Sequence, residues 1–137
     1  MLSVTRRYRF SASHRLHAQA LTEQENHALY GKCNNPWGHG HNYLLEVTVS
    51  GTRNPLTGQV MALSALDRLV HHEVIEKLDH RDLNREIGMP DGAVPTSENL
   101  VRDIERRLLA AWPAECAAKL AGLRLRETRR NSFEIER

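Results

Sequence analysis

The chain has 137 residues, of which 40% are hydrophobic and 26% charged, the composition of one globular domain with its own core. Its net charge is +2 and its acidic and basic residues are interspersed, so charge alone does not indicate a nucleic-acid-binding protein. No apolar run approaches the roughly 18 residues of a membrane span and the first residues lack the apolar core of a signal peptide, so we expect a single cytoplasmic domain over residues 1–137.

The histidine and cysteine contents add two expectations. Eight histidines are more than a chain of this length usually carries, which favours a metal site. Two cysteines in a cytoplasmic protein are expected to be free thiols rather than a disulfide.

The first predicted element is a strand over residues 3–14, where apolar and polar side chains alternate. Tyr8 and Phe10 have the apolar parity, and His14 at the end of the strand shares it. A second strand is predicted over residues 42–51, before a turn. The two strands follow each other in the chain, so antiparallel pairing would bring His14 close to the start of the second strand.

Two more histidines stand at that start. His39 and His41 are two positions apart, so in an extended chain their rings point the same way, on the side that continues through Tyr43. This is the buried side, where an unpaired polar ring is costly. Together with His14 they predict a metal site, because three imidazoles leave the fourth position of a tetrahedral zinc open for water or substrate. The alternative is that all three are hydrogen-bonded core or loop histidines.

Two helices are predicted next. Ser64, with Asp67 three residues later, resembles a capping box and predicts a helix over about 65–78. A second helix is predicted over about 97–111, from apolar residues at helical spacing and from the polar residues at its start.

Two short strands are predicted at the end of the chain, over about 122–129 and 131–136. The full order is strand, strand, helix, helix, strand, strand. This order predicts an α+β domain in which an antiparallel four-stranded sheet carries two helices on one face.

Outside the histidine group, three side chains could move a proton. Cys33 lies six residues before His39, and a nearby cation or metal would favour its thiolate as a base or nucleophile; an inert buried cysteine is an equal alternative. Asp79 and His80 form an adjacent carboxylate and imidazole, a pair suited to proton transfer. A polar helix end explains this pair equally well.

Glu127 is predicted to face inward, because it shares strand parity with Leu123 and Leu125. A carboxylate in that position needs a partner, and its two oxygens match the paired N–H donors of an amino-pyrimidinone ring. A solvent-facing glutamate at a strand end is the alternative. The segment Thr96-Ser97-Glu98 is explained by helix capping, although a helix start also receives polar ligand groups.

Taken together, these residues resemble the 6-pyruvoyl-tetrahydropterin synthase family, which includes the 6-carboxytetrahydropterin synthases. Six motifs carry the resemblance in order along nearly the whole chain: Phe10-Ser-Ala-Ser-His14-Arg-Leu, Leu29-Tyr-Gly-Lys-Cys33-Asn-Asn-Pro, Gly38-His39-Gly-His41-Asn-Tyr, Leu78-Asp79-His80, Pro95-Thr96-Ser97-Glu98-Asn99 and Glu127-Thr128.

The resemblance implies the tunnelling (T-fold) architecture, in which the sheets of three subunits join into a barrel and two such trimers stack as a homo-hexamer. It implies zinc bound by His14, His39 and His41, with Cys33 as the catalytic base. Asp79 and His80 would support that base from a neighbouring subunit. Glu127 would anchor the pterin ring, and Thr96, Ser97 and Glu98 would help to line the pocket.

The implied reaction converts 7,8-dihydroneopterin triphosphate to 6-pyruvoyl-tetrahydropterin, with elimination of triphosphate. Arg15, Lys32 and Arg81 are candidates to meet the triphosphate, from their nearness to the motifs. The alternative is the 6-carboxy product of the queuosine pathway, formed from the same substrate with release of acetaldehyde. Five residues separate Cys33 from His39, a spacing that looks like the pyruvoyl-type enzymes, so we expect the pyruvoyl product.

The chain departs from the family pattern at Ala62 and Ala65, where polar residues are usual, and at Trp37, where a small polar residue is common. The two alanines are the only support for a second hypothesis, a non-catalytic pterin-binding protein. A third hypothesis, an RNA-binding domain, rests on four arginines whose parity indicates an ordinary charged face instead: Arg124, Arg126, Arg129 and Arg130.

Overall fold

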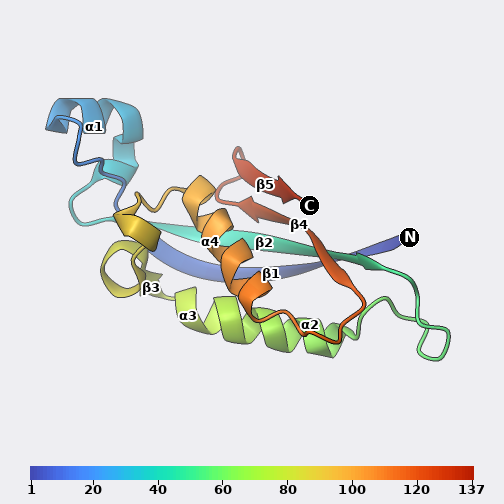
Figure 1. The fold of residues 1–137 in the computed structure, drawn as a ribbon. Coiled ribbons are helices and arrows are strands. Elements are labelled where there is room, and N and C mark those ends of the chain that lie inside the picture. Colours follow the sequence, from blue (N-terminus) through green and yellow to red (C-terminus); the bar gives the residue numbers. More distant parts are fainter.

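The computed structural model describes all 137 residues, and its centre is a five-stranded sheet in the order β3-β1-β2-β4-β5 (Figure 1). The strands are β1 (Leu2–His14), β2 (His39–Gly51), β3 (Arg81–Asp82), β4 (Lys119–Arg126) and β5 (Ser132–Glu136). All neighbours are antiparallel except β3, which runs parallel to β1.

The predicted α+β class is therefore correct, while the predicted four-stranded antiparallel sheet lacks one strand. The missing strand, β3, contains only two residues, which pair with Ala12 and Ser13 at the edge of β1. Two residues are too few to show an alternating pattern. The chain reaches this edge because His80, directly before β3, has φ +58°, which turns the backbone out of the preceding helix.

The alternation of apolar side chains in β1 and β2 is confirmed. Tyr8, Phe10 and His14 are buried on the face that also carries Tyr43 and Leu45 of β2. The pairing register places His14 opposite His39, and Ala12 opposite His41. This register brings the two histidine-bearing strand ends together.

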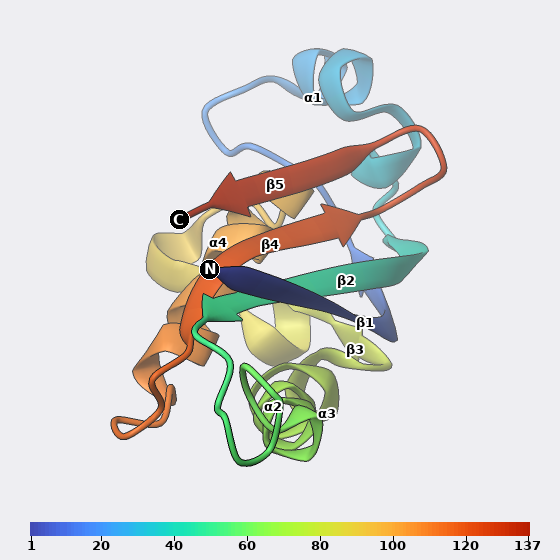
Figure 2. The same ribbon diagram turned by 90° about the vertical axis from the view of Figure 1, so that its right-hand side faces the viewer.

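Two helical segments cover this face of the sheet, as seen with the sheet in front of them in Figure 2. The first is a continuous rod formed by α2 (Leu63–Val70), a π-helical turn over His71–Ile75 and α3 (Glu76–Leu78). The second is α4 (Ser97–Ala110). A further π turn (Leu83–Ile87) and a 3-10 turn (Pro90–Gly92) connect them. None of these helices combines the length and the apolar character that a membrane span requires.

The two predicted helix starts have different outcomes. Thr96 caps α4, since its side chain accepts a hydrogen bond from the Asn99 N–H, as expected. The predicted cap at Ser64 is wrong, because α2 starts at Leu63, after Ala62, with no side-chain cap. With this start, Asp67 lies too far along the helix to complete a capping box, and it accepts hydrogen bonds from Arg6 and Tyr8 of β1 instead.

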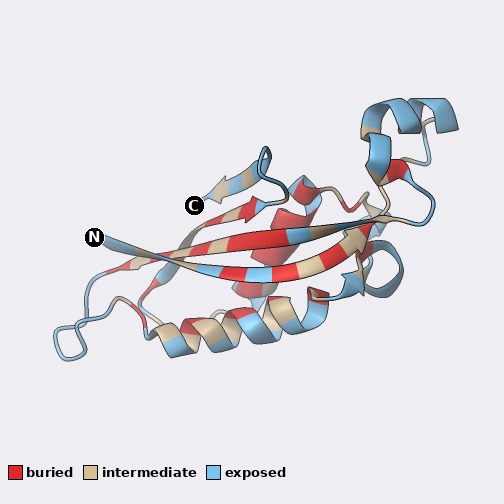
Figure 3. Cartoon of the chain, turned by 180° about the vertical axis from the view of Figure 1, so that it is seen from behind, coloured by how far each residue is buried: buried red, intermediate tan, exposed pale blue.

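The core lies between the sheet and these helices, where Figure 3 shows the buried residues. Its members are mainly aliphatic and include Leu45, Leu66, Leu78, Leu100 and Ile104, each with none of its surface exposed. The sheet's other face is more polar and exposed. The core therefore fixes the direction in which His14 and His41 point.

A further helix, α1 (Glu23–Tyr30), was not predicted. Together with the 3-10 turn Gly31–Asn34, it forms a lobe that connects β1 to β2 along the chain and projects from one end of the molecule (Figure 1). The capping box formed by Thr22 and Glu25 starts the helix. Its sequence signal is Thr22-Glu-Gln-Glu25, followed by only two full turns without an apolar stripe, so periodicity alone does not reveal it.

Candidate metal centre

Four ligand-type side chains converge beside the lobe at the end of the sheet. His14, Cys33, His41 and Glu127 each offer one metal-ligand atom, and these atoms all lie within 4.8 Å of one another. The His14 and His41 Nε2 atoms are 3.1 Å apart, and the Cys33 sulfur is 3.7 Å from His41 Nε2. A bond length of 2.0–2.1 Å to zinc at a tetrahedral angle separates two nitrogens by roughly 3.3 Å, so the pair fits a shared ion.

His14 is fully buried, and a hydrogen bond fixes its tautomer. Its Nδ1 lies 2.9 Å from the Pro95 carbonyl oxygen, which can only accept, so Nδ1 carries the proton and Nε2 faces the cluster with its lone pair. Burial and the neighbouring His41 lower the pKa of His14. A neutral imidazole with the outer nitrogen bonded to a carbonyl is the usual state of a metal-binding histidine.

Glu127 lies just after β4 and faces inward, as its parity predicts. Its Oε1 is 3.0 Å from His41 Nε2, and the Ser97 hydroxyl donates to Oε2 at 3.0 Å. The bond with His41 holds the pKa of Glu127 below its usual value, against the opposite effect of burial. The carboxylate is therefore ionised at neutral pH and fixed from two sides.

Cys33 enters the cluster from the lobe. Two hydrogen bonds tie this part of the lobe to the segment just after β1. The Leu16 N–H donates to the Cys33 carbonyl at 2.7 Å, and the Asn34 side chain donates to the Leu16 carbonyl at 2.7 Å. Burial raises the pKa of the thiol, with a smaller contribution from the Glu127 charge. A cation bound in the cluster acts in the opposite direction.

His39 is next to the cluster without joining it. Its ring centroid lies 4.7 Å from that of His41, yet its nitrogens are outside the group of four converging ligand atoms. Gly38, with φ +87°, turns the chain directly before it. Of the three predicted ligands, the structure brings His14 and His41 together and places His39 in contact range of His41.

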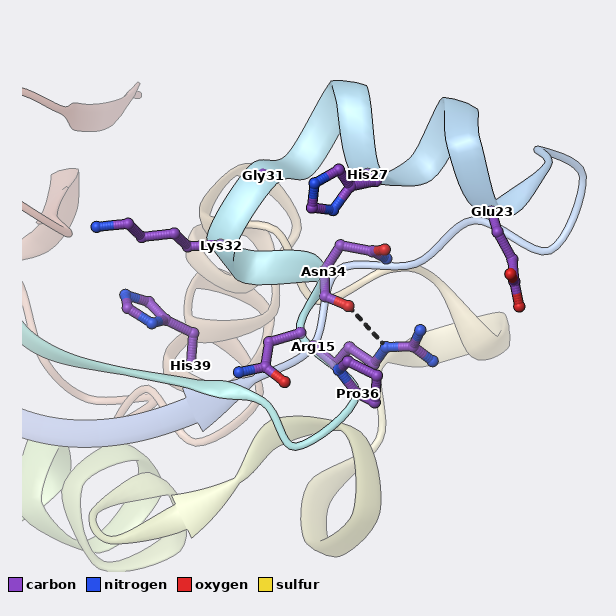
Figure 4. Close-up of a pocket in the computed structure, with 9 residues that line it drawn as sticks. Arg15, Glu23, His27, Gly31, Lys32, Asn34, Pro36 and His39 are labelled. Carbon is purple, nitrogen blue, oxygen red and sulfur yellow. Dashed lines mark hydrogen bonds between the residues drawn. The ribbon is translucent and has the colours of Figure 1, made fainter.

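His39 also lines a polar pocket of about 600 Å³ beneath the lobe (Figure 4). Arg15, Lys32 and His27 contribute basic side chains, and no hydrophobic residue lines the pocket. Figure 4 shows Lys32 and His39 on the same side and Glu23, the one acidic residue, at the far end. Arg15 Nε donates to the Asn34 carbonyl at 3.2 Å, and no acidic group pairs with Arg15 or Lys32. The pocket suits an anion.

Asp79 and His80 lie outside the four-residue cluster of the same chain. Asp79 Oδ1 accepts from the Ser11 N–H at 2.8 Å, and its Oδ2 is 3.3 Å from Nδ1 of His80, whose side chain is 83% exposed. The pair therefore sits at the β1 edge, open to whatever approaches there. Arg81, beside it, bonds with Glu86 and is not part of the pocket of Figure 4.

The remaining predicted residues lie at the start of α4. Ser97 is buried and contacts Glu127, whereas Thr96 caps the helix and Glu98 is exposed. Sequence reasoning missed Pro95, which acts through its backbone carbonyl and so carries no side-chain signal, and Asn34, whose side-chain amide donates to the Leu16 carbonyl. Among the four arginines, Arg124 pairs with Glu134 at 3.0 Å, which fits a charged strand face.

Comparison with known proteins identifies relatives along the whole chain. A family model described as 6-pyruvoyl tetrahydropterin synthase matches residues 3–137. A Poecilia reticulata protein named 6-pyruvoyl tetrahydrobiopterin synthase is 42% identical over 93% of this chain and 85% of its own length. The human protein of that name is 46% identical over 71% of this chain and 67% of its own.

A solved structure extends this similarity to the fold. The 6-pyruvoyl tetrahydropterin synthase of Caenorhabditis elegans superposes with a TM-score of 0.89 at 33% identity, covering 98% of this chain and 94% of that one.

Proposed function

The chain belongs to the 6-pyruvoyl tetrahydropterin synthase family, and we propose that it is a zinc-dependent lyase that converts 7,8-dihydroneopterin triphosphate to 6-pyruvoyl-tetrahydropterin with elimination of triphosphate. The observation that carries the proposal is the convergence of His14, Cys33, His41 and Glu127 beside a basic pocket. This arrangement supplies a metal site, a thiol base, a carboxylate anchor and an anion site in one place.

We infer that zinc is the ion and that His14, His39 and His41 hold it. The nitrogen donors and the buried, carbonyl-bonded His14 fit zinc, and the 3.1 Å separation of two Nε2 atoms fits its size. His39 is near enough to complete the set, its ring centroid being 4.7 Å from that of His41. When bound, zinc would polarise the hydroxyl oxygens of the substrate side chain and acidify the adjacent C–H bonds.

The protein's own residues then divide the work. The Cys33 thiolate takes the proton from the side-chain carbon, since its sulfur is part of the cluster at which that carbon is held. The ionised Glu127 accepts two N–H bonds from the pterin ring. Arg15 and Lys32, in the pocket beyond His39, bind the triphosphate and stabilise the charge that develops as it leaves.

Asp79 and His80 are assigned to the site of a neighbouring subunit in a homo-hexamer. Their place at the β1 edge, away from their own chain's cluster, supports this assignment. Two sheet edges are also open: β3 covers only Ala12 and Ser13 of β1, and β5 has no outer neighbour. Unpaired edges of this kind are templates for joining sheets between subunits.

Incubation with 7,8-dihydroneopterin triphosphate tests the proposal. Mass analysis is expected to show 6-pyruvoyl-tetrahydropterin, with one triphosphate released per turnover and no acetaldehyde. Acetaldehyde and a 6-carboxy product would assign the chain to the alternative reaction. Tight zinc and neopterin binding without triphosphate release under any condition would support a non-catalytic pterin-binding protein instead.

A further inference from the structure

One buried polar group at the floor of the site has no hydrogen-bond partner, the hydroxyl of Tyr43. Tyr43 is 1% exposed and lies on β2, two residues after His41. Arg124 Nε is the only other side-chain atom buried in this way, and it lies 3.0 Å from a Glu134 carboxylate oxygen. A buried hydroxyl without a hydrogen-bond partner lowers the stability of the folded protein. The Tyr43 hydroxyl therefore needs an explanation in terms of function.

The ring of Tyr43 is fixed so that its hydroxyl points into the site. It stacks on Phe10 at a centroid distance of 5.0 Å and meets the His41 ring edge-on at 5.7 Å. Burial raises the pKa of the Tyr43 phenol, and the charge of the nearby Glu127 raises it further. The hydroxyl is thus a rigid donor close to the carboxylate.

Glu127 has two donors in this structure, His41 Nε2 and the Ser97 hydroxyl. The first cannot persist in a metal-loaded site. A ring nitrogen that binds a cation gives it the lone pair and carries no proton, so His41 then has no Nε2–H to donate. Loading the metal therefore removes one of the two bonds that orient Glu127, in the state in which substrate binds.

We propose that Tyr43 is a positioning residue of this site: its hydroxyl replaces His41 as the second donor to Glu127 once the metal is bound. This role rests on the proposed function. The Tyr43 hydroxyl holds the Glu127 carboxylate toward the paired N–H groups of an amino-pyrimidinone ring. Tyr43 does not itself touch the substrate, because its oxygen is covered by protein.

Removal of the Tyr43 hydroxyl is expected to have different effects on the melting temperature and on neopterin affinity. In Tyr43→Phe without metal, loss of an unpartnered hydroxyl is expected to leave the melting temperature unchanged or higher. In the zinc-loaded protein, the same variant is expected to bind neopterin roughly 5- to 10-fold more weakly, the value of one hydrogen bond. Its zinc stoichiometry should equal that of the unsubstituted protein.

Tyr8→Phe is the matched control. The Tyr8 hydroxyl donates to Asp67 at 2.8 Å, outside the site, so this variant is expected to melt at a lower temperature and to bind neopterin normally. Melting would be followed by calorimetry on the zinc-free proteins, and neopterin binding by fluorescence titration of the zinc-loaded ones.

Equal neopterin affinity in Tyr43→Phe and the unsubstituted protein would overturn the inference while leaving the proposed function intact. So would a lower melting temperature like that of Tyr8→Phe, because it would mean that the hydroxyl already has a partner. Failure of the unsubstituted zinc-loaded protein to bind neopterin would overturn the proposed function, and the inference with it.

Discussion

At the scale of single residues, Cys33 and His39 are the two candidates for the third protein ligand of the proposed zinc. The sulfur of Cys33 is 3.7 Å from His41 Nε2, close to the roughly 3.6 Å expected for a sulfur and a nitrogen on one tetrahedral zinc. The ring centroid of His39 lies 4.7 Å from that of His41, and His39 would complete a set of three imidazole ligands. The two residues therefore make different predictions when substituted.

We expect Cys33→Ala to retain one zinc per chain and to lose turnover by a factor of ~10² or more, since a general base contributes that much. His39→Ala is expected to lose zinc. Metal content by elemental analysis after dialysis, together with triphosphate release, checks both. The reverse pattern, with zinc lost from Cys33→Ala and retained in His39→Ala, would make the thiol a ligand and leave the reaction without its proposed base.

The bond from Ser97 to Glu127 gives a second residue-scale prediction. Ser97→Ala removes one donor from the anchoring carboxylate, and because the hydroxyl is buried the loss is expected to cost about 1 kcal/mol of pterin binding. KM for the pterin substrate should rise several-fold while zinc content stays constant. Thr5→Ala, which removes an exposed hydroxyl bond to Thr48 at the opposite end of β1 from the site, is the control and should leave KM unchanged.

At the scale of elements, β1 and α2 are joined by a polar link. Asp67 of α2 accepts from Arg6 Nε and Nη2 at 2.9 and 2.8 Å and from the Tyr8 hydroxyl at 2.8 Å. The hydrogen bond from Arg6 holds the pKa of Asp67 at about 2, below the ordinary 3.8.

The link predicts a pH dependence of stability. Because the pKa is lower in the folded protein, the link contributes fully above the unfolded pKa and is lost as the pH falls from about 4 to about 2. Its contribution is about 1 kcal/mol after allowance for solvent screening, since Asp67 and Arg6 are partly exposed. In urea titrations, Asp67→Asn should be less stable than the unsubstituted protein at pH 6, and the difference should vanish near pH 2. A difference that persists at pH 2 would mean that packing, and not charge, is lost.

The α1 lobe is held by polar side chains instead of a hydrophobic core. Asn26 is fully buried: its Oδ1 accepts from the Ala18 N–H at 2.7 Å, and its Nδ2 donates to the carbonyls of Ala18, Leu21 and Thr22. Cys33 and the basic pocket belong to this lobe. The order of the lobe therefore determines whether the proposed base and the proposed anion site are in place.

We expect Asn26→Ala to loosen the lobe without unfolding the sheet, because a buried group left unpaired costs ~1–3 kcal/mol locally. Hydrogen exchange should accelerate in residues 18–34 and not in β1 or β2, and KM for the triphosphate substrate should rise. Glu25→Ala, which breaks only the exposed half of the capping box, is the milder comparison. Uniformly faster exchange over the whole chain would show that the lobe is not a separate unit.

At the scale of the whole molecule, the parts that were predictable from sequence are those with a local signal. Strand parity placed His14, His41 and Glu127 on one buried face, and the apolar spacing of α4 gave its bounds within a residue. The α1 lobe and β3 could not be predicted because α1 has only two turns without an apolar stripe and β3 has only two residues. Asp79 and His80 lie at a sheet edge because of the direction that the chain takes after α3. The alternation of side chains along a strand carries no information on that direction.

The assignment of Asp79 and His80 to a neighbouring subunit has a direct test in mixed oligomers. Cys33→Ala and His80→Ala should each be inactive alone, since each lacks one half of the proton-transfer machinery. If the two halves meet between subunits, refolding a 1:1 mixture gives sites with Cys33 from one chain and His80 from the next, about a quarter of all sites for random assembly. Turnover should therefore return to about a quarter of the unsubstituted level after co-refolding, and not after simple mixing of folded proteins. If both residues served the same chain's cluster, no site would hold both, and the mixture would stay inactive.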